Sequence, residues 1–364
     1  MVREIYVGLM SGTSLDGVDA CVVDLSGGRF QVVAGAHLPF ESELRGGLLA
    51  LNVAGGDEIH RASVLGAELA HRYAAATRAA LEAAGVSAAD VRAIGCHGQT
   101  IRHRPELGYT VQLANPALLA ELCGIRVVAD FRSRDIAAGG QGAPLAPAFH
   151  VFAFGGSGED RVVLNLGGIA NLTWLPRSGP VMGFDSGPGN CLMDLWAHRH
   201  LGTPMDAGGS WASSGEVDRR LLDRFLAEPY LAAPPPKSTG RDLFNESWLL
   251  EHGAEDPEPA ATQATLLEFS ARCVSDAQKR FCASARKVIV CGGGARNTAL
   301  MNRLGALCAP AEVASSESHG LAPEQVEPVA FAWLAKMAMQ GEPGNLPAVT
   351  GARGLRVLGA IYPA

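Results

Sequence analysis

A pattern of strand, glycine turn and strand occurs twice in this chain of 364 residues. In the first copy, apolar segments at 5–9 and 18–25 flank Ser11, Gly12 and the pair Asp16-Gly17. The second copy covers 161–175 and turns at Gly167-Gly168, and a third strand is expected after each copy, up to residue 38 and at 181–184. This repetition is the pattern of a duplicated α/β fold in which each half presents a hairpin to a shared cleft.

The first turn has the composition of an anion site. Asp16-Gly17 between two strand-like runs predicts a hairpin. Gly12 allows a ligand to approach the backbone, and Ser11, Thr13 and Ser14 place hydroxyls around it. Such a turn can direct several N–H groups at a phosphate. A tight hairpin of small residues with no ligand explains the same pattern equally well, so the rest of the chain has to decide.

Periodicity and punctuation predict the other elements. Pro116 after Asn115 and Gly124 are typical of the first turn and the end of a helix. We expect helices at 61–84, 116–123, 216–228, 244–252, 261–284, 297 onward and 324–340, and strands at 91–96, 125–129, 287–291 and 355–361.

Charge and cysteine usage exclude several classes of protein. The net charge is −7, which gives no support to nucleic-acid binding. Eight cysteines without a C-x-x-C pair argue against a zinc site and favour buried, reduced thiols. No apolar run reaches the length of a membrane span, and no secretory signal begins the chain, so we expect a cytoplasmic protein that binds no membrane.

The glycine turns after strands point to a particular kind of nucleotide site. No Gly-Lys pair and no G-x-G-x-x-G after a strand occur, which excludes a P-loop and a dinucleotide fingerprint. Three glycine turns remain, at 11–17, 167–168 and 292–294. Two phosphate hairpins with a third turn beside a nucleoside is the layout of the superfamily of actin, heat-shock ATPases and sugar kinases.

Asp185 is the sharpest single candidate for catalysis. The segment Phe184-Asp185-Ser186-Gly187 predicts a strand that delivers the carboxylate to an open, glycine-containing loop, with a helix beginning near Asn190. A general base that accepts a proton from a nucleophile is one interpretation. An aspartate that caps the turn is the other.

Four further polar positions follow strands. His97 and Gln99 come after the strand at 91–96 and are of the kind that bind sugar hydroxyls, although a lone histidine there is more often structural. Arg132 and Arg134 flank Ser133, and a substrate carboxylate would suit an arginine fork. A surface salt bridge is the alternative for each arginine.

Together these motifs resemble the signature segments of the anhydro-N-acetylmuramic acid kinase family. The resemblance runs through essentially the whole chain, at 8–19, 97–100, 130–144, 165–171, 184–194, 235–244, 292–297 and 345–352. It implies a duplicated actin-like (ribonuclease H-like) ATPase fold, with two lobes around a nucleotide cleft. It also implies a kinase that uses ATP and water to convert 1,6-anhydro-N-acetylmuramic acid into N-acetylmuramic acid 6-phosphate during recycling of bacterial cell wall. The family suggests a homodimer.

The resemblance carries residue roles and boundaries with it. It implies Asp185 as the base, Arg134 and Glu327 as sugar contacts, and His97 and Gln99 in the same pocket. ATP would be held by the first hairpin, the second hairpin and the nucleoside turn, at Gly12, Thr13, Ser14, Leu15, Asp16, Gly17, Val18, Asp19, Gly167, Gly168, Gly292, Gly293 and Gly294. Lobe I is expected at 1–130 with 342–364, and lobe II at 131–341.

Two departures from the expected pattern stand out. Ser186 stands where the family often has threonine, which keeps the hydroxyl. The wider superfamily usually has a metal-linked aspartate on the first strand, where this chain has Leu9 or Met10. Asp16, Asp19 and Asp185 therefore remain as alternative carboxylates for Mg²⁺.

The anhydro sugar sets the chemistry. Its O6 is tied to C1, so a base must activate water toward C1 while O6 is released onto the γ-phosphoryl group. Asp185 would then act as in a glycosidase, with phosphoryl transfer trapping the leaving oxygen. A conventional kinase for a free sugar hydroxyl is the rival on the same fold. An actin- or chaperone-like ATPase is the rival from another class, and no substrate-binding domain or filament insertion favours it.

Overall fold

The computed structural model describes residues 3–12, 15–156, 158–254 and 258–364. The chain divides into two compact units, residues 1–153 with 325–364 and residues 154–324. These boundaries differ from the expected ones at 130/131 and 341/342. The segment 131–153 and the helix at 326–340 belong to the first unit, because that helix packs on the first sheet.

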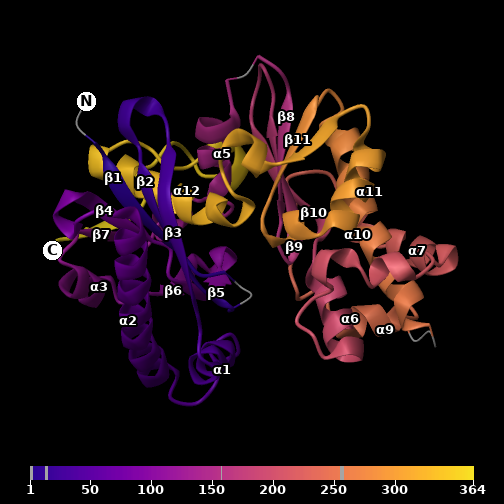
Figure 1. Cartoon of the computed structure of the whole chain (residues 1–364), viewed down its shortest axis with the longest axis horizontal. Helices are drawn as coiled ribbons and strands as arrows, with labels where there is room; N and C mark the ends of the chain where they lie inside the picture. The colour runs from indigo at the N-terminus through magenta and orange to yellow at the C-terminus, as the bar shows by residue number, and fades with distance from the viewer. Residues whose placement is uncertain (1–2, 13–14, 157, 255–257) are drawn as a thin grey trace. The chain divides into compact units, whose positions relative to one another are not determined.

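The first unit is built on a six-stranded sheet of order β13-β7-β4-β1-β2-β3 (Figure 1). Its strands, with a separate two-stranded sheet of β5 and β6, are β1 Ile5–Met10, β2 Gly17–Asp24, β3 Gln31–Pro39, β4 Val91–Cys96, β5 Gln99–Arg104, β6 Tyr109–Leu113, β7 Val127–Ala129 and β13 Ala360–Tyr362. Its helices are α1 Ser42–Ala50, α2 Glu58–Ala84, α3 Pro116–Cys123, α4 Ser133–Ala137, α5 Ala146–Phe154 (whose last residue begins the second unit), α12 Val326–Gln340 and α13 Pro347–Thr350.

Two helices cover opposite faces of the first sheet. Val7 and Leu9 share a buried cluster with the apolar stripe of α2, which contains Leu69 and Tyr73. Gly8 points to the other face, as alternation along a strand requires, and there α12 lies on β1. Both long helices end where predicted, at Gly85 and Gly341 in the left-handed region.

The second unit is built on a five-stranded sheet of order β10-β9-β8-β11-β12. Its strands are β8 Arg161–Leu166, β9 Ile169–Leu175, β10 Met182–Pro188, β11 Lys287–Cys291 and β12 Glu312–Ser315. Its helices are α6 Cys191–Leu201, α7 Arg219–Leu226, α8 Pro229–Ala232, α9 Glu246–Glu251, α10 Pro259–Phe281 and α11 Thr298–Cys308.

The predicted duplication is confirmed by the topology of the two sheets. In each unit three consecutive strands pair antiparallel, and the first of them pairs parallel with a later strand, β1 with β4 and β8 with β11. A further parallel strand follows, β7 in one sheet and β12 in the other. The fold class is therefore the duplicated actin-like α/β fold that the resemblance implied.

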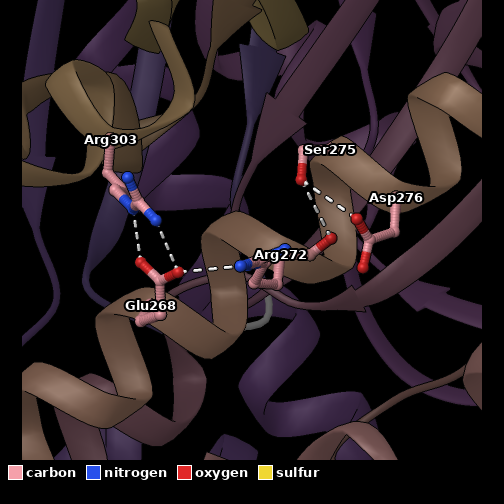
Figure 2. Close-up of polar contacts among 5 residues, drawn as sticks. All are labelled: Glu268, Arg272, Ser275, Asp276 and Arg303. Atoms are coloured by element: carbon pink, nitrogen blue, oxygen red, sulfur yellow. Dashed lines mark hydrogen bonds and ion pairs between the residues drawn. The ribbon is translucent and has the colours of Figure 1, made fainter. Parts of the chain in front are cut away.

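An ion-pair network around the buried Glu268 side chain joins α10 to α11 in the second unit (Figure 2). Arg303 of α11 donates from Nη2 to Glu268 Oε1 at 2.8 Å, and Arg272 donates from Nε to the same oxygen at 3.1 Å. Burial acts to raise the pKa of Glu268, but these guanidinium contacts outweigh it and lower the pKa. A charged carboxylate therefore stays in this helix interface because it is paired twice.

Two local predictions differ from the structure. β1 and β2 pair antiparallel as expected, but β2 already begins at Gly17, so Asp16-Gly17 is not a two-residue turn between them, and Leu15 takes a φ of 54°. Gly17 is required instead by packing, because a Cβ there would lie 2.3 Å from the carbonyl oxygen of Leu38 on β3. Asp185 lies inside β10 rather than in a loop after it, paired with Asn171 of β9.

Candidate active site

The turn after β1 is held by hydrogen bonds that involve buried side chains. Ser11 Oγ lies 2.7 Å from Tyr73 Oη of α2 and donates to the carbonyl oxygen of Gly98 at 3.2 Å. Gln99 of β5 donates from Nε2 to the carbonyl oxygen of Gly12 at 3.1 Å. Gln99 is therefore tied to the predicted phosphate turn, and its buried Oε1 has no hydrogen-bond partner among the described residues. Thr13 and Ser14, both predicted to bind ATP, lie outside the described residues.

The remaining residues of the first hairpin differ in what they can offer a phosphate. Leu15 and Val18 are buried in the core of the first unit, so only their main chains can contact a ligand. Asp16 is exposed. Asp19 Oδ1 lies 2.8 Å from His37 Nδ1, and its side chain is 37% exposed. The described part of the chain contains no group of three or more acidic, histidine or cysteine side chains that could hold a metal.

His97, Arg132 and Glu327 form a second polar group in the same unit. Arg132 donates from Nε and Nη2 to His97 Nε2 at 3.1 and 2.7 Å, and from Nη1 to the carbonyl oxygen of Gly142 at 2.9 Å. Burial, together with the Arg132 charge, lowers the pKa of His97 well below its ordinary value. His97 therefore stays neutral and accepts through Nε2, as a guanidinium partner requires.

Burial raises the pKa of Glu327, against the opposing effect of Arg132, while Asp19 adds to the rise. The same burial lowers the pKa of Arg132 to about 10, and Glu327 counters it. Glu327, predicted as a sugar contact, thus lies in the electrostatic field of Asp19 and Arg132. Sequence spacing gave no sign of this, because Glu327 is far from both along the chain.

Two paired glycines allow Glu327 to reach this position. Gly8 of β1 and Gly95 of β4 are register partners in the sheet. A Cβ on Gly8 would lie 1.7 Å from the carbonyl oxygen of Pro328, and one on Gly95 would lie 2.0 Å from that of Phe331. The backbone of α12 therefore rests directly on the sheet, and its first turn, which carries Glu327, is held beside the ends of β1 and β4.

Arg134 is presented differently from Arg132. It lies on the short helix α4 and is exposed, and its guanidinium makes no hydrogen bond or ion pair with another described residue. The predicted salt-bridge alternative for Arg134 thus finds no partner in the described part of the chain. Arg132 is held by His97 and the Gly142 carbonyl oxygen, and no surface salt bridge is found for it among the described residues, whereas the exposed guanidinium of Arg134 is accessible.

The Asp185 carboxylate has one oriented oxygen and one open oxygen. Its Oδ2 accepts from the backbone N–H of Thr239 at 3.0 Å and from Ser238 Oγ at 3.2 Å. No hydrogen bond from a described residue reaches Oδ1. Burial raises the pKa of Asp185, and the hydrogen bonds from Thr239 and Ser238 and the charge of Lys237 oppose that rise. A carboxylate with a raised pKa and a free oxygen can accept a proton.

The other two glycine turns lie side by side in the second unit. Cys291, just before Gly292, is the register partner of Asn165, just before the β8–β9 turn. A Cβ on Gly292 would lie 2.3 Å from Asn165 Oδ1, and one on Gly294 would lie 2.7 Å from Leu166 Cβ, so packing demands both glycines.

Gly167, Gly168 and Gly293 are not demanded by packing. A Cβ at Gly167 or Gly168 would meet its nearest atom at an ordinary 3.5 or 3.7 Å, and one at Gly293 would meet nothing within 4 Å. None of the three has a positive φ. Neither packing nor backbone conformation therefore requires glycine at these three positions, whereas a ligand that approaches the backbone closely would require it.

The family model for anhydro-N-acetylmuramic acid kinase matches residues 4–364. The chain belongs to the anhydro-N-acetylmuramic acid kinase family. A relative of that name from Variovorax paradoxus (strain S110) is 53% identical over 375 residues, which cover 100% of both chains. A second, from Bordetella petrii, is 54% identical over 99% of this chain and 97% of its own. At much greater distance, a ROK family glucokinase from Streptomyces griseus, solved with glucose and AMPPNP, is 15% identical over 92% of this chain and 99% of its own, with a TM-score of 0.42.

Several groups near Asp185 carry no sequence signal that singles them out. Ser238 and Thr239, which contact Asp185, and Tyr230 and Lys237 beside them were not singled out as site residues. The only signal was the resemblance of the segment 235–244, which assigned no role to a residue.

None of the described helices is long and apolar enough to span a membrane.

Proposed function

We propose that Asp185 of this anhydro-N-acetylmuramic acid kinase is the base that activates water for opening of the 1,6-anhydro ring. The enzyme phosphorylates the sugar at O6 with ATP, in cell-wall recycling. Water attacks C1 and gives a proton to Asp185 Oδ1, the C1–O6 bond breaks, and O6 attacks the γ-phosphorus as ADP leaves. N-acetylmuramic acid 6-phosphate is the product. The observation that carries the assignment is that Oδ2 of Asp185 accepts two hydrogen bonds, whereas no described residue donates to Oδ1.

The glycine turns would position ATP. Backbone N–H groups at 12–19 and at Gly167-Gly168 would surround the phosphates, and Gly292, Gly293 and Gly294 would contact the nucleoside. Gly167, Gly168 and Gly293 support this because neither packing nor backbone conformation requires glycine there. Phosphoryl transfer needs mainly positioning and charge neutralisation, which such N–H groups supply.

Mg²⁺ would neutralise charge on the phosphates when it is bound. It usually keeps several waters and takes only one or two carboxylates. With Asp185 proposed as the base, Asp16 or Asp19 would supply the carboxylate. Asp16 is exposed and Asp19 is partly exposed. Both carboxylates of the first hairpin are therefore accessible to a hydrated ion.

The sugar would be held by Arg134 and Glu327. The exposed Arg134 guanidinium suits the lactyl carboxylate, which it can grip with two parallel hydrogen bonds. Glu327 would accept a hydrogen bond from a sugar hydroxyl. Arg132, bonded to His97, would set the charge around Glu327, and Gln99 would hold the turn at Gly12.

The first prediction tests this mechanism. Asp185→Asn should lower kcat by roughly two to four orders of magnitude, as expected for a missing general base, while ATP binding survives. Turnover in ¹⁸O water should place label on C1 of the sugar product and none in the transferred phosphate. The product has to be read promptly by mass spectrometry, before the anomeric hydroxyl exchanges with solvent. A conventional kinase would put label in neither position, and labelled phosphate would mean that water attacked ATP.

A further inference from the structure

Residues 230–239, here called the clamp segment, hold both the main chain and the side chain of Asp185. Tyr230 Oη donates to the Asp185 carbonyl oxygen at 2.8 Å, and the Asp185 N–H donates to the carbonyl oxygen of Lys237 at 3.1 Å. Ser238 Oγ and the Thr239 N–H both donate to Oδ2. One continuous stretch of chain therefore fixes the position and the rotation of this carboxylate.

Lys237 in turn closes the clamp segment on itself. Its Nζ donates to the carbonyl oxygens of Tyr230 and Leu231 at 3.2 and 3.1 Å, and it lies 4.6 Å from the centre of the Tyr230 ring. These carbonyls belong to the short helix α8, and that of Tyr230 also accepts from the backbone N–H of Ala233 at 3.2 Å. Lys237, which immediately precedes Ser238, is thereby hydrogen-bonded to the start of the clamp segment.

Other charged and titratable groups near the carboxylate come from α10. Cys273 packs against β10, where a Cβ on Gly187 would lie 3.1 Å from its Sγ. Burial raises the pKa of the Cys273 thiol, so it stays neutral. Arg280 donates to the carbonyl oxygen of Ala232 at 2.9 Å and so holds the middle of the clamp segment. Burial lowers the pKa of Lys237, and its positive charge and the hydroxyl of Ser238 are the side-chain groups that favour ionised Asp185.

We propose that Lys237 and Ser238 are positioning residues for the reaction, acting through Asp185. This rests on the proposed role of Asp185 as the base. The two oxygens of an aspartate are chemically equivalent and exchange by rotation of the carboxylate, whose torsion has broad, two-fold minima. Two donors on Oδ2 remove that equivalence and leave Oδ1 as the oxygen that faces water. A base held in one orientation reacts faster than one that has to find it.

Ser238 gives the sharper test because its removal leaves the backbone contacts in place. Ser238→Ala should lower kcat about tenfold, with KM for ATP and for the sugar within about twofold of wild type. Ser238→Thr keeps the hydroxyl and should restore most of kcat. Because the hydroxyl stabilises ionised Asp185, its loss should move the acidic limb of the kcat profile to higher pH.

Lys237→Met tests the closure of the segment. It should lower kcat by at least as much as Ser238→Ala and move the acidic limb in the same direction, since a positive charge near the carboxylate is lost. The matched control is Lys279→Met, an exposed lysine of α10 in the same unit, which should behave as wild type. Thermal unfolding and ATP binding of each full-length variant, measured alongside, should stay close to wild type.

The clamp fails if Ser238→Ala keeps wild-type kcat and the wild-type acidic limb, or if Ser238→Thr is as slow as Ser238→Ala. It also fails if Lys237→Met matches Lys279→Met in both readouts. Asp185→Asn run in parallel separates this result from failure of the proposed function. An inactive Asp185→Asn beside unaffected clamp variants would reject the clamp alone, whereas an active Asp185→Asn would reject the base itself.

Discussion

Arg132 and Arg134 are two residues apart and yet have opposite environments. Arg132 uses its guanidinium on His97 and on the carbonyl oxygen of Gly142. Arg134, on the exposed side of α4, has no such partner among the described residues. Their spacing predicts a fork for a carboxylate but cannot say which of them is available. Tertiary contacts with His97, which follows β4, and with Gly142, which follows α4, make that choice.

A prediction at the residue scale concerns Arg134. Arg134→Lys keeps the charge and loses the planar fork, so KM for the anhydro sugar should rise about tenfold before kcat falls. Steady-state kinetics with saturating ATP measures both constants, and Arg126→Lys, an exposed arginine of the same unit, is the control. The role would be wrong if anhydro-N-acetylglucosamine, which lacks the lactyl acid, were as good a substrate as the natural sugar.

At the scale of elements, the position of α12 decides where Glu327 lies. The helix can rest on β1 and β4 only because Gly8 and Gly95 are paired across the two strands and lack Cβ atoms. Helix-to-sheet packing usually places side chains between the backbones, so this approach is unusually close. It brings the first turn of α12 to the strand ends, where polar residues of the first unit gather.

Gly95→Ala tests this contact. Its Cβ would lie 2.0 Å from the carbonyl oxygen of Phe331, so α12 has to move outward. We expect a loss of about 3 kcal/mol in the free energy of unfolding, as for an overpacked core, together with a raised KM for the sugar. Gly46→Ala in α1 meets nothing within 4 Å and should stabilise the protein by up to about 1 kcal/mol. Equal urea midpoints for the two variants would contradict this account.

At the scale of the whole molecule, the two units should respond differently to acid. In the first unit burial lowers the pKa of His97 well below its ordinary value and that of His150 to about 3. In the second unit burial raises the pKa of Asp194 to about 6, helped by Asp206 and opposed by Arg241. Below pH 6.5 the two histidines therefore bind protons in the unfolded first unit but not in the folded one. Asp194 behaves in the opposite way, because its carboxylate binds a proton in the folded second unit at a pH where the unfolded form is still ionised.

Lowering the pH from 7 to 5 should thus cost the first unit about 2 kcal/mol for each buried histidine. Asp194 acts in the opposite direction and protects the second unit. Urea unfolding at the two pH values measures the difference, and at pH 5 the ordinary carboxylates remain ionised. His150→Gln should reduce the loss by about 2 kcal/mol, whereas the exposed His60→Gln should leave it unchanged. An unchanged pH dependence in His150→Gln would refute the assignment.

The sequence by itself determined the repeated strand–turn–strand unit, most of the long helices and the family. These depend on local patterns, such as strand alternation and helix punctuation at Pro116 and Gly124, that neighbouring residues carry together. The continuous motifs at 8–19 and 184–194 were enough to single out Gly12 and Asp185. Asp185 was nevertheless placed in a loop, because pairing with Asn171 on another strand extends β10 beyond its apolar part.

Only the tertiary structure decided which distant groups meet. The partners of Asp185 come from residues 230–239, and the surroundings of Glu327 come from Asp19 of β2, His97 after β4 and Arg132 before α4. The boundaries of the units were also set this way, since α12 joins the first unit through contacts with β1 and β4. Contacts between residues far apart in the chain leave no periodic trace, because each depends on how whole elements pack and not on the order of neighbouring residues.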